Sequence, residues 1–470
     1  MVRILTLALL ALTLQAQPAE AESLPAPVIS ALKNHQLDGG GLSVFVQDVN
    51  EDEPLLDFNS GVPRSPASVI KLVTTFAALD LLGPAYEWTT EVWITGPVQD
   101  GRLEGDLVLR GGGDPALSTE RFWTMLREIR AHGIYEIAGD LVIDDSRFAP
   151  AAGQPGDFDK QPFRAYNVQP SALLVNHNIA EFRVRHGASG VEVYVDPPLQ
   201  GFLIENRIAP RRGACSGFQR GVGFHLPGGL EGQRAVLSGS FPSGCPQYSL
   251  WRAVLPAPQF VDGLFRVLWF QLGGLIEGGL RVEPVPEGAG LIYTHRSPPL
   301  AEQVRQINKW SNNAMTRHLF LTLGIERYGA PGTLEKGRDA ISEWFASREI
   351  EIPGLYIDNG SGLSRRTRIT ARGLGEMLLD AWRHPYMAEL MSSMPVAAID
   401  GTLRNRHKGE MAGRLHLKTG TLDDVSALAG LMLAKNGHRY VVVIIMNEPG
   451  AHRGSGEAVQ AAILRSVFRR

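Results

Sequence analysis

The sequence predicts a mixed α/β (α+β) fold in which an antiparallel sheet flanked by helices is interrupted by β-rich insertions. Strand-like runs and helical runs occupy both ends of the chain, whereas residues 92–290 hold short alternating runs separated by Gly and Pro. The 470 residues exceed what one core accommodates, because single cores stop growing near about 250–300 residues. With 44% hydrophobic and 20% charged residues, the composition excludes disordered and fibrous chains.

The first residues have the layout of a signal peptide. Arg3 precedes an apolar run, and the polar stretch that follows ends in the A-x-A sequence Ala19-Glu20-Ala21. The apolar run is too short to span a bilayer core of about 30 Å as a helix, so we expect cleavage near Ala21 and no transmembrane anchor. Residues 1–21 are therefore predicted to be removed on export.

Charge and histidine spacing exclude several classes of function. The net charge of -3 provides no general attraction to nucleic acid or to anionic membranes. The 12 histidines are scattered without the H-E-x-x-H spacing of a zinc site, and no glycine-rich run has the form of a nucleotide fingerprint. We therefore expect no metal and no cofactor.

The two cysteines, Cys215 and Cys245, each lie beside a turn-rich segment. In an oxidising compartment such a pair forms a disulfide more often than a metal or redox site, and the C-x-x-C spacing of a redox motif is absent. We predict a structural disulfide between them, with two buried free thiols as the alternative.

The N-terminal part of the predicted sheet is a hairpin followed by a helix. Residues 41–49 alternate apolar and polar side chains, and a turn separates them from LLDFN at 55–59, as in an antiparallel hairpin. Ser65-Pro66-Ala67 then offers a cap and an early proline to an apolar run that stops at Gly83-Pro84. This run predicts a mostly buried helix of about four turns.

Three strand-like runs and a helix end the chain. The runs cover 416–424, 426–434 and 440–447, and Lys435-Asn436-Gly437-His438 joins the last two as a hairpin turn. Residues 455–470 have an amphipathic pattern, which favours a helix packed on the sheet over a helix lying on a membrane surface.

Ser68 and Lys71 are the first candidates for chemistry, because positions i and i+3 share one face at the start of the predicted helix. A serine becomes a nucleophile when a base removes its proton. A lysine serves as that base only if burial or a neighbouring cation lowers its pKa. A second S-x-x-K match, from Ser30 to Lys33, precedes the first strand and lacks this setting.

Two further segments carry groups that suit acyl transfer. In Lys418-Thr419-Gly420-Thr421 the glycine permits close approach of a ligand, the lysine and first threonine can bind a carboxylate, and the next backbone N–H can face an oxyanion. Ser311-Asn312-Asn313 opens a helical stretch and supplies a hydroxyl and an amide. Taken singly, Ser311 is better explained as a helix N-cap, and Lys418 as a surface lysine.

In this order the three segments have the S-x-x-K, S-x-N and K-T-G pattern of serine penicillin-binding enzymes. The chain resembles most closely the class C low-molecular-mass penicillin-binding proteins, the D-alanyl-D-alanine carboxypeptidase/endopeptidase family. Its second motif is S-N-N in place of S-D-N or Y-x-N. The resemblance covers nearly the whole mature chain. Further segments that look like the family are residues 109–115, 164–167, 359–365 and 400–403.

The resemblance implies a penicillin-binding, β-lactamase-like catalytic domain into which two β-rich domains are inserted after the first motif. The long interval between the first two motifs would hold them. The expected division assigns 22–91 and 289–470 to the catalytic domain, 92–174 and 255–288 to a second domain, and 175–254 to a third domain nested in the second.

The resemblance also implies roles for the motif residues. Ser68 would attack the carbonyl between two D-alanines with Lys71 as base, and the terminal D-alanine would leave from a covalent acyl-enzyme. Ser311 would pass a proton to the leaving amine. Asn313 would hold Lys71 and the substrate amide.

The K-T-G segment would bind the other end of the substrate. Lys418 and Thr419 would bind its terminal carboxylate, and the charge of Lys418 would help to keep Lys71 neutral. Backbone N–H groups of Ser68 and Thr421 would form the oxyanion hole, with Gly420 beside them.

In the family, an acidic residue of the insertion can engage the amino group of a diaminopimelate side chain. Asp159 is the candidate in this sequence and Asp157 is its rival, and a solvated loop carboxylate is the alternative role for either. Arg365 and Asp400 are expected to shape the cleft or to hold turns.

The resemblance thus implies a periplasmic serine carboxypeptidase and endopeptidase that acts on peptidoglycan peptides and is acylated by β-lactam antibiotics. One alternative is a β-lactamase of the same fold, although an E-x-x-L-N segment of the class A kind is absent. The other is a catalytically idle wall-binding module, which would have no physical need for the complete set of motif residues.

Overall fold

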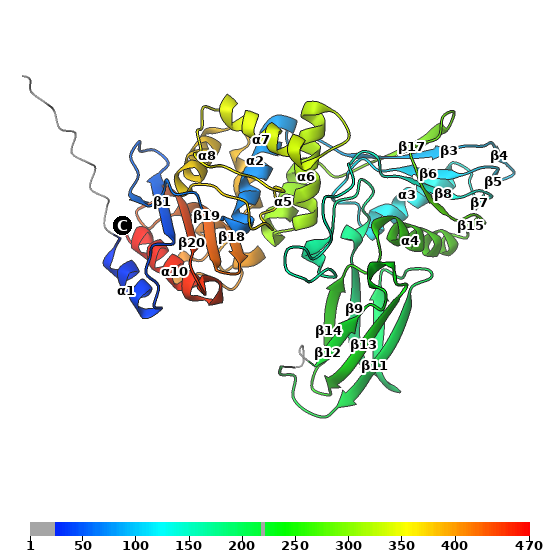
Figure 1. Cartoon of the computed structure of the whole chain (residues 1–470), viewed down its shortest axis with the longest axis horizontal. Helices are drawn as coiled ribbons and strands as arrows, with labels where there is room; N and C mark the ends of the chain where they lie inside the picture. Colours follow the sequence, from blue (N-terminus) through cyan, green and yellow to red (C-terminus); the bar gives the residue numbers. More distant parts are fainter. Residues whose placement is uncertain (1–23, 218–220) are drawn as a thin grey trace, which may run out of the picture.

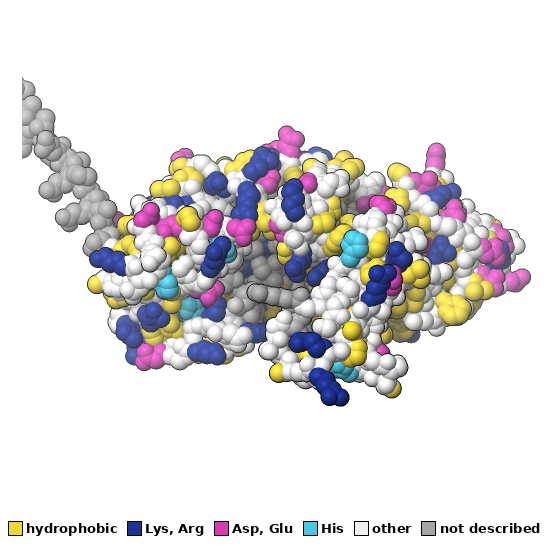
Figure 2. Space-filling model, turned by 60° about the horizontal axis from the view of Figure 1, so that its bottom comes forward, with side chains coloured by type: hydrophobic (Ala, Val, Ile, Leu, Met, Phe, Trp, Pro, Cys, Tyr) yellow, Lys and Arg dark blue, Asp and Glu magenta, His cyan; other side chains and the backbone are white. Residues whose placement is uncertain are grey.

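The computed structural model describes residues 24–217 and 221–470, and the predicted signal peptide lies outside the described residues. Both ends of the chain form one sheet that is flanked by helices, and this unit lies beside the insertion (Figure 1). A further β unit projects from the insertion. Basic and acidic side chains are interspersed over the face of the molecule seen in Figure 2.

Both ends of the chain contribute to one five-stranded antiparallel sheet with the order β18-β19-β20-β1-β2. The N-terminal hairpin completes the three C-terminal strands, because β1 pairs with β2 on one side and with β20 on the other. The predicted hairpin and the three predicted strands are confirmed. The strands are β1 (Leu42–Asp48), β2 (Leu56–Phe58), β18 (Leu415–Leu422), β19 (Val425–Leu433) and β20 (Arg439–Asn447).

Alternation along these strands produces two hydrophobic cores. Val441 and Val443 of β20 belong to one cluster of buried residues, and Val442 belongs to the other. Successive side chains of a strand point to opposite faces, so each face of the sheet needs its own cover. One face is covered by α1 (Ala26–Asn34) and α10 (Ser455–Phe468), so the C-terminal amphipathic run packs on the sheet as predicted.

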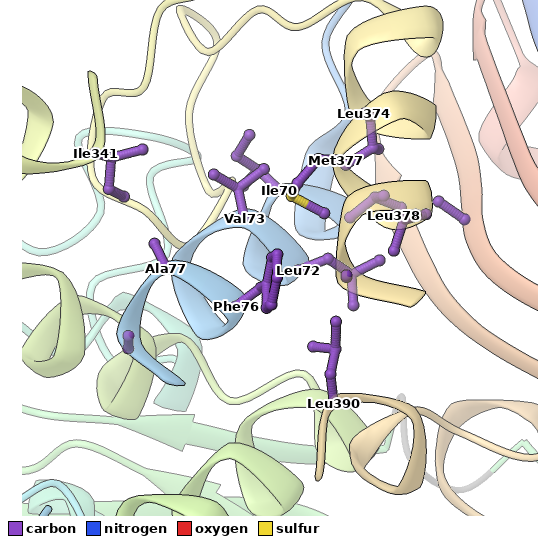
Figure 3. Packing of buried hydrophobic residues seen from close by; sticks show 14 of the residues in the cluster. Ile70, Leu72, Val73, Phe76, Ala77, Ile341, Leu374, Met377, Leu378 and Leu390 are labelled. Atoms are coloured by element: carbon purple, nitrogen blue, oxygen red, sulfur yellow. The ribbon is translucent and has the colours of Figure 1, made fainter. Parts of the chain in front are cut away.

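The predicted helix after the hairpin is confirmed. It begins as the 3-10 turn η1 (Ala67–Ile70), continues as α2 (Lys71–Leu82) and ends at Gly83, whose φ of +81° is left-handed. Figure 3 shows Phe76 of α2 among apolar residues of three other helices. The cap expected from Ser65 is not formed: Pro66 occupies the N-cap position of η1, and no side chain caps its start.

Five further helices surround α2 or lie on the same side of the sheet. A helix that is apolar on all sides is stable only when it is buried, and residues Lys71 to Leu79 of α2 are all buried. In residues 24–217 and 221–470, no helix combines the length and the apolar stretch that a bilayer crossing requires. The five helices are α5 (Leu300–Trp310), α6 (Asn313–Tyr328), α7 (Leu334–Ser347), α8 (Ala371–Arg383) and α9 (Met387–Ser393).

The insertion contains a five-stranded mixed sheet with the order β16-β8-β6-β3-β17, and a smaller sheet with the order β15-β7-β5-β4. The strands of the first are β16 (Leu280–Val282), β8 (Leu141–Asp144), β6 (Leu107–Arg110), β3 (Thr89–Ile94) and β17 (Gly290–Arg296). Those of the second are β15 (Leu275–Ile276), β7 (Glu136–Ile137), β5 (Arg102–Leu103) and β4 (Val98–Gln99). Strand β3 crosses the expected bound at 91/92, and its partner β17 lies wholly in the segment assigned to the catalytic domain, past the bound at 288/289. The domain division stays a prediction.

Two helices of the insertion, α3 (Thr119–Ala131) and α4 (Ala257–Gln271), were not singled out in the sequence. Phe122, Met125 and Ile129 of α3 are buried at helical spacing, so the signal was present. The short alternating runs and turns around both helices predict strands, and this stronger pattern concealed the helical spacing.

The projecting β unit consists of two three-stranded sheets that share one hydrophobic cluster. A disulfide between Cys215 and Cys245 ties the segments that follow two neighbouring strands of one sheet, which confirms the predicted pairing and excludes free thiols at these positions. The strands are β9 (Ala180–Gly187), β10 (Gly190–Asp196), β14 (Gln247–Arg252), β11 (Leu203–Arg211), β12 (Val222–His225) and β13 (Arg234–Pro242).

Loss of the disulfide is expected to destabilise this β unit. Replacing both Cys215 and Cys245 by Ser should lower the free energy of unfolding by about 3–4 kcal/mol, because the unfolded chain regains the freedom of the closed loop. Differential scanning calorimetry of the oxidised protein and the double variant measures the loss. Identical melting curves would contradict the expectation.

Candidate active site

Lys71 and Ser68 lie together where η1 passes into α2. The Lys71 Nζ atom is 3.0 Å from Ser68 Oγ, 2.7 Å from Asn313 Oδ1 and 2.5 Å from the backbone oxygen of Ser361. A neutral amine has two N–H groups and one lone pair. The two N–H groups match the two carbonyl acceptors, so the lone pair is left to face the hydroxyl of Ser68.

The surroundings of Lys71 favour this neutral form. Burial lowers its pKa well below the ordinary value, and the nearby charges of Lys418 and Arg317 lower it further. The side chain is fully buried, so water does not screen these effects. Lys71 therefore meets the condition for a base that removes the proton of Ser68.

Lys418 reaches the same site from strand β18. Its Nζ donates to Ser311 Oγ at 2.9 Å and to the backbone oxygen of Thr419 at 2.8 Å. The side chain is fully buried, and burial lowers its pKa to about 7. The alternative of a surface lysine is therefore wrong.

Ser311 lies in a left-handed turn between α5 and α6, with φ of +58°. The N-cap of α6 is Asn312, whose side chain accepts from the backbone N–H of Met315. The N-cap alternative for Ser311 is therefore wrong: the residue is the C-cap of α5, and its hydroxyl contacts Lys418. Asn313 is the first residue of α6, which places its amide beside Lys71.

Gly420 allows β18 to lie directly against the turn that carries Ser68. A Cβ atom at this position would be 2.5 Å from the backbone oxygen of Pro66 and 3.1 Å from the backbone nitrogen of Ser68. Thr421 follows as an exposed residue, and Thr419 Oγ1 donates to Thr402 Oγ1 at 2.8 Å. The absence of a side chain at 420 thus sets the spacing between Ser68 and the strand.

A loop of the insertion completes the site beside Asn313. Asn313 Nδ2 donates to the backbone oxygen of Tyr166 at 3.3 Å, and the Tyr166 hydroxyl donates to Asp159 Oδ2 at 2.7 Å. Asn167 Nδ2 donates to the other oxygen of Asp159 at 2.8 Å. Partial burial acts to raise the pKa of Asp159, but the hydrogen bonds from Tyr166 and Asn167 outweigh it and hold the pKa below its ordinary value.

The other predicted acidic and basic residues have structural contacts. Asp157 accepts from the backbone N–H of Gln154 within its own exposed loop, and no contact joins it to the motif residues in the described parts of the chain. Asp400 pairs with Lys309 at 2.6 Å and holds a turn. Arg365 pairs with Asp423, just after β18, at 2.9 Å and lies 4.8 Å from the ring of Phe158 in the loop of the insertion.

Three contributors to the site were not identified from the sequence. The backbone oxygens of Ser361 and Tyr166 accept hydrogen bonds from Lys71 and Asn313, and a backbone acceptor has no signature in side-chain chemistry. Arg317 is the third, and its place one turn after Asn313 on the same face of a helix was available as a signal. Among the described residues, no group of three or more His, Cys, Asp or Glu is arranged to hold a metal ion.

Comparison with known proteins identifies the family. A family model described as the D-Ala-D-Ala carboxypeptidase 3 (S13) family matches residues 24–466. The chain belongs to this family. The resemblance inferred from the three motifs is confirmed, and the protein is an enzyme of the serine-type D-Ala-D-Ala carboxypeptidase class.

Individual relatives agree with the family model. The D-alanyl-D-alanine carboxypeptidase of Actinomadura sp. (strain R39) is 30% identical, over 98% of this chain and 88% of that protein. The D-alanyl-D-alanine carboxypeptidase DacB of Haemophilus influenzae is 25% identical, over 89% and 88%. Penicillin binding protein 4 of Haemophilus influenzae, a solved structure, matches with a TM-score of 0.80 at 21% identity, over 94% of this chain and 99% of that one, so the predicted fold class is confirmed.

Replacing Gly420 by Ala is expected to slow acylation of the enzyme by benzylpenicillin at least about tenfold. The added Cβ would force β18 away from Ser68 and disturb the spacing on which an oxyanion site depends. Stopped-flow or quenched mass spectrometry measures the acylation rate. The matched control is Gly61→Ala, because a Cβ at Gly61 meets nothing within 4 Å. Equal rates for both variants would contradict the expectation.

Proposed function

We propose that the protein is a serine D-alanyl-D-alanine carboxypeptidase and endopeptidase that acts on peptidoglycan stem peptides through an acyl-enzyme on Ser68, and that β-lactams acylate the same serine. One observation carries the proposal: the fully buried Lys71 amine lies 3.0 Å from Ser68 Oγ, with its two N–H groups bound elsewhere. Family membership and the relatives' names support the substrate.

In the proposed mechanism, Ser68 Oγ forms a bond to the carbonyl carbon between the two D-alanines while its proton passes to Lys71. The C–N bond then breaks, and Ser311 gives its proton to the departing amine while it takes up the proton that Lys71 removed from Ser68, so Lys71 and Ser311 are both restored. Lys418 is within hydrogen-bond distance of Ser311 and supports this transfer. Water hydrolyses the acyl-enzyme in the second half of the reaction, and Ser68 regains its proton.

The oxyanion and the carboxylate of the substrate are assigned to β18 and η1. Backbone N–H groups of Ser68 and Thr421 would stabilise the oxyanion, a contribution of about 3–4 kcal/mol for one such donor. Lys418 and Thr419 would bind the terminal carboxylate. A bound carboxylate favours the protonated form of Lys418, which burial alone disfavours, so substrate binding would restore its charge.

Asp159 is proposed to bind the amino group of the diaminopimelate side chain. Its carboxylate is joined through Tyr166 to Asn313, and its lowered pKa keeps it ionised at neutral pH. Asp157 is the weaker candidate, because its carboxylate is used by the turn at Gln154.

The periplasm is the proposed location. The signal-peptide pattern of residues 1–21 supports export, and the disulfide between Cys215 and Cys245 is typical of an oxidising compartment. Peptidoglycan, the proposed substrate, lies in the same compartment.

The proposed function is tested by the intact mass of the mature protein after brief and long exposure to benzylpenicillin. We expect a long-lived adduct that maps to Ser68 and is absent in Ser68→Ala. Loss of the drug without a lasting adduct would favour a β-lactamase instead. Absence of any reaction would favour the idle wall-binding module.

The role of Asp159 is tested with two pentapeptides that end in D-Ala-D-Ala and carry diaminopimelate, one with a free side-chain amine and one with that amine acetylated. Asp159→Asn should lower kcat/KM for the free-amine peptide by about 10-fold to 100-fold, which is the worth of a hydrogen bond between charged groups. The acetylated peptide should be affected little, and Asp157→Asn should leave both unchanged. Equal losses on the two peptides would contradict the role.

A further inference from the structure

The two reactions of the proposed function differ in the size of the leaving group. In a pentapeptide the leaving group is D-alanine. In a crosslink it is a second stem peptide, which departs through the side-chain amine of its diaminopimelate residue. The carbon that bears this amine also carries a carboxylate, as in D-alanine, so Lys418 and Thr419 would bind both leaving groups in the same way. Only residues beyond this carboxylate contact can distinguish a crosslink from a pentapeptide.

Strand β18 sets the direction in which the leaving group extends. The proposed mechanism assigns the oxyanion to Thr421 and the carboxylate of the substrate to Lys418 and Thr419. Along the strand, the step from the scissile carbonyl to the leaving group therefore runs from Thr421 toward Thr419. Thr419 Oγ1 donates at 2.8 Å to Oγ1 of Thr402, an exposed residue of the turn that comes next on this side. The part of the leaving group beyond its carboxylate would extend over this turn.

The turn that contains Thr402 is packed against the end of α5. The Nζ atom of Lys309 lies 2.6 Å from Asp400 Oδ2. A Cβ atom at Gly401 would be 2.7 Å from the backbone oxygen of Lys309, so the two segments are in direct contact. Ser311, the proposed proton donor to the leaving amine, follows α5 as its C-cap. The end of α5 and the turn thus form one surface at the leaving-group end of the site.

Two large apolar side chains of this surface are exposed. Trp310 is 59% exposed and Ile399 is 64% exposed, and each is the chain neighbour of one member of the pair between Lys309 and Asp400. Within residues 24–217 and 221–470, no hydrogen bond and no aromatic or cation–π contact engages the indole of Trp310. A single exposed apolar residue is ordinary, but two on adjoining segments beside an active site indicate a binding surface.

Arg404 adds a positive charge to the same turn. Its side chain is exposed, and in the described parts of the chain it forms no ion pair and no hydrogen bond. The nearby carboxylate of Asp400 is already paired with Lys309. A leaving stem peptide carries carboxylates in addition to the one that the K-T-G segment would bind, so an unpaired arginine at this place complements its charge.

We propose that Trp310, Ile399 and Arg404 form the subsite that binds the leaving strand of a peptidoglycan crosslink. The proposal rests on the proposed function, because it uses the same acyl-enzyme on Ser68. In this step the bond between the D-alanine carbonyl carbon and the diaminopimelate side-chain nitrogen breaks, the acyl group stays on Ser68 Oγ, and the nitrogen gains the proton of Ser311. The subsite holds the departing peptide through apolar contacts and one ion pair.

The test compares two substrates of the mature protein: an uncrosslinked pentapeptide that ends in D-Ala-D-Ala, and a dimer of tetrapeptides joined through D-alanine and diaminopimelate. Trp310→Ala should lower kcat/KM for the dimer about tenfold, mainly through a higher KM, because the leaving strand loses the apolar area that it would bury on the indole. For the pentapeptide, kcat/KM should change by less than about twofold, and so should the rate of acylation by benzylpenicillin. Chromatography of the products measures both hydrolyses.

Further variants separate binding from structure. Trp310→Phe keeps an aromatic ring and should retain most of the activity on the dimer. Trp251→Ala removes a tryptophan of similar exposure, 53%, from β14 of the projecting β unit and should leave both hydrolyses unchanged. Ile399→Ala and Arg404→Gln should each lower kcat/KM for the dimer about threefold. The loss in Arg404→Gln should shrink as the salt concentration rises, because salt screens exposed charges.

The inference is overturned if Trp310→Ala leaves both hydrolyses unaffected. It is also overturned if this variant slows both equally, because that pattern indicates a displaced Ser311 and not a lost contact. A wild-type protein that cleaves the pentapeptide but not the dimer overturns the inference and leaves the carboxypeptidase activity standing. A wild-type protein that cleaves neither substrate and is not acylated by benzylpenicillin would instead refute the proposed function, so the failures are distinguishable.

Discussion

The burial of the Lys71 amine is the constraint on which the rest of the site depends. An ammonium group in this position would need a counterion as well as hydrogen-bond acceptors. The structure supplies two carbonyl oxygens and the Ser68 hydroxyl, but the charges that act on the amine are those of two cations. These groups come from η1, α6, β18 and the loop that contains Ser361. The tertiary fold therefore decides the protonation state, and the protonation state decides whether Ser68 can be activated.

The insertion is part of this arrangement as well as a separate structural unit. One of its loops crosses α6, where the backbone oxygens of Tyr166 and Val168 accept from Asn313 and Arg317. The same loop carries Asp159 toward the site. The loop is therefore held in a fixed position relative to Asn313, because each hydrogen bond orients it relative to α6.

Side-chain patterns predicted the sheet of both chain ends, the buried helix and the disulfide, because alternation, helical spacing and cysteine pairing are local or compositional signals. The helices α3 and α4 were not predicted, because turn-rich runs surround them, although Phe122 and Ile129 are spaced as helix residues. The cap assigned to Ser65 was wrong, because η1 begins at Ala67 with Pro66 at its N-cap position, and no side chain caps it.

The sequence by itself determined which groups are available for chemistry: a serine and a lysine one helical turn apart, and the later Ser311 and Lys418 segments that share their pattern with a family of serine enzymes. Only the tertiary structure decided what these groups can do. It buried Lys71, and it excluded an N-cap role for Ser311 and a surface role for Lys418. The physical reason is that pKa and nucleophilicity depend on desolvation and on charges contributed by residues far away in the chain.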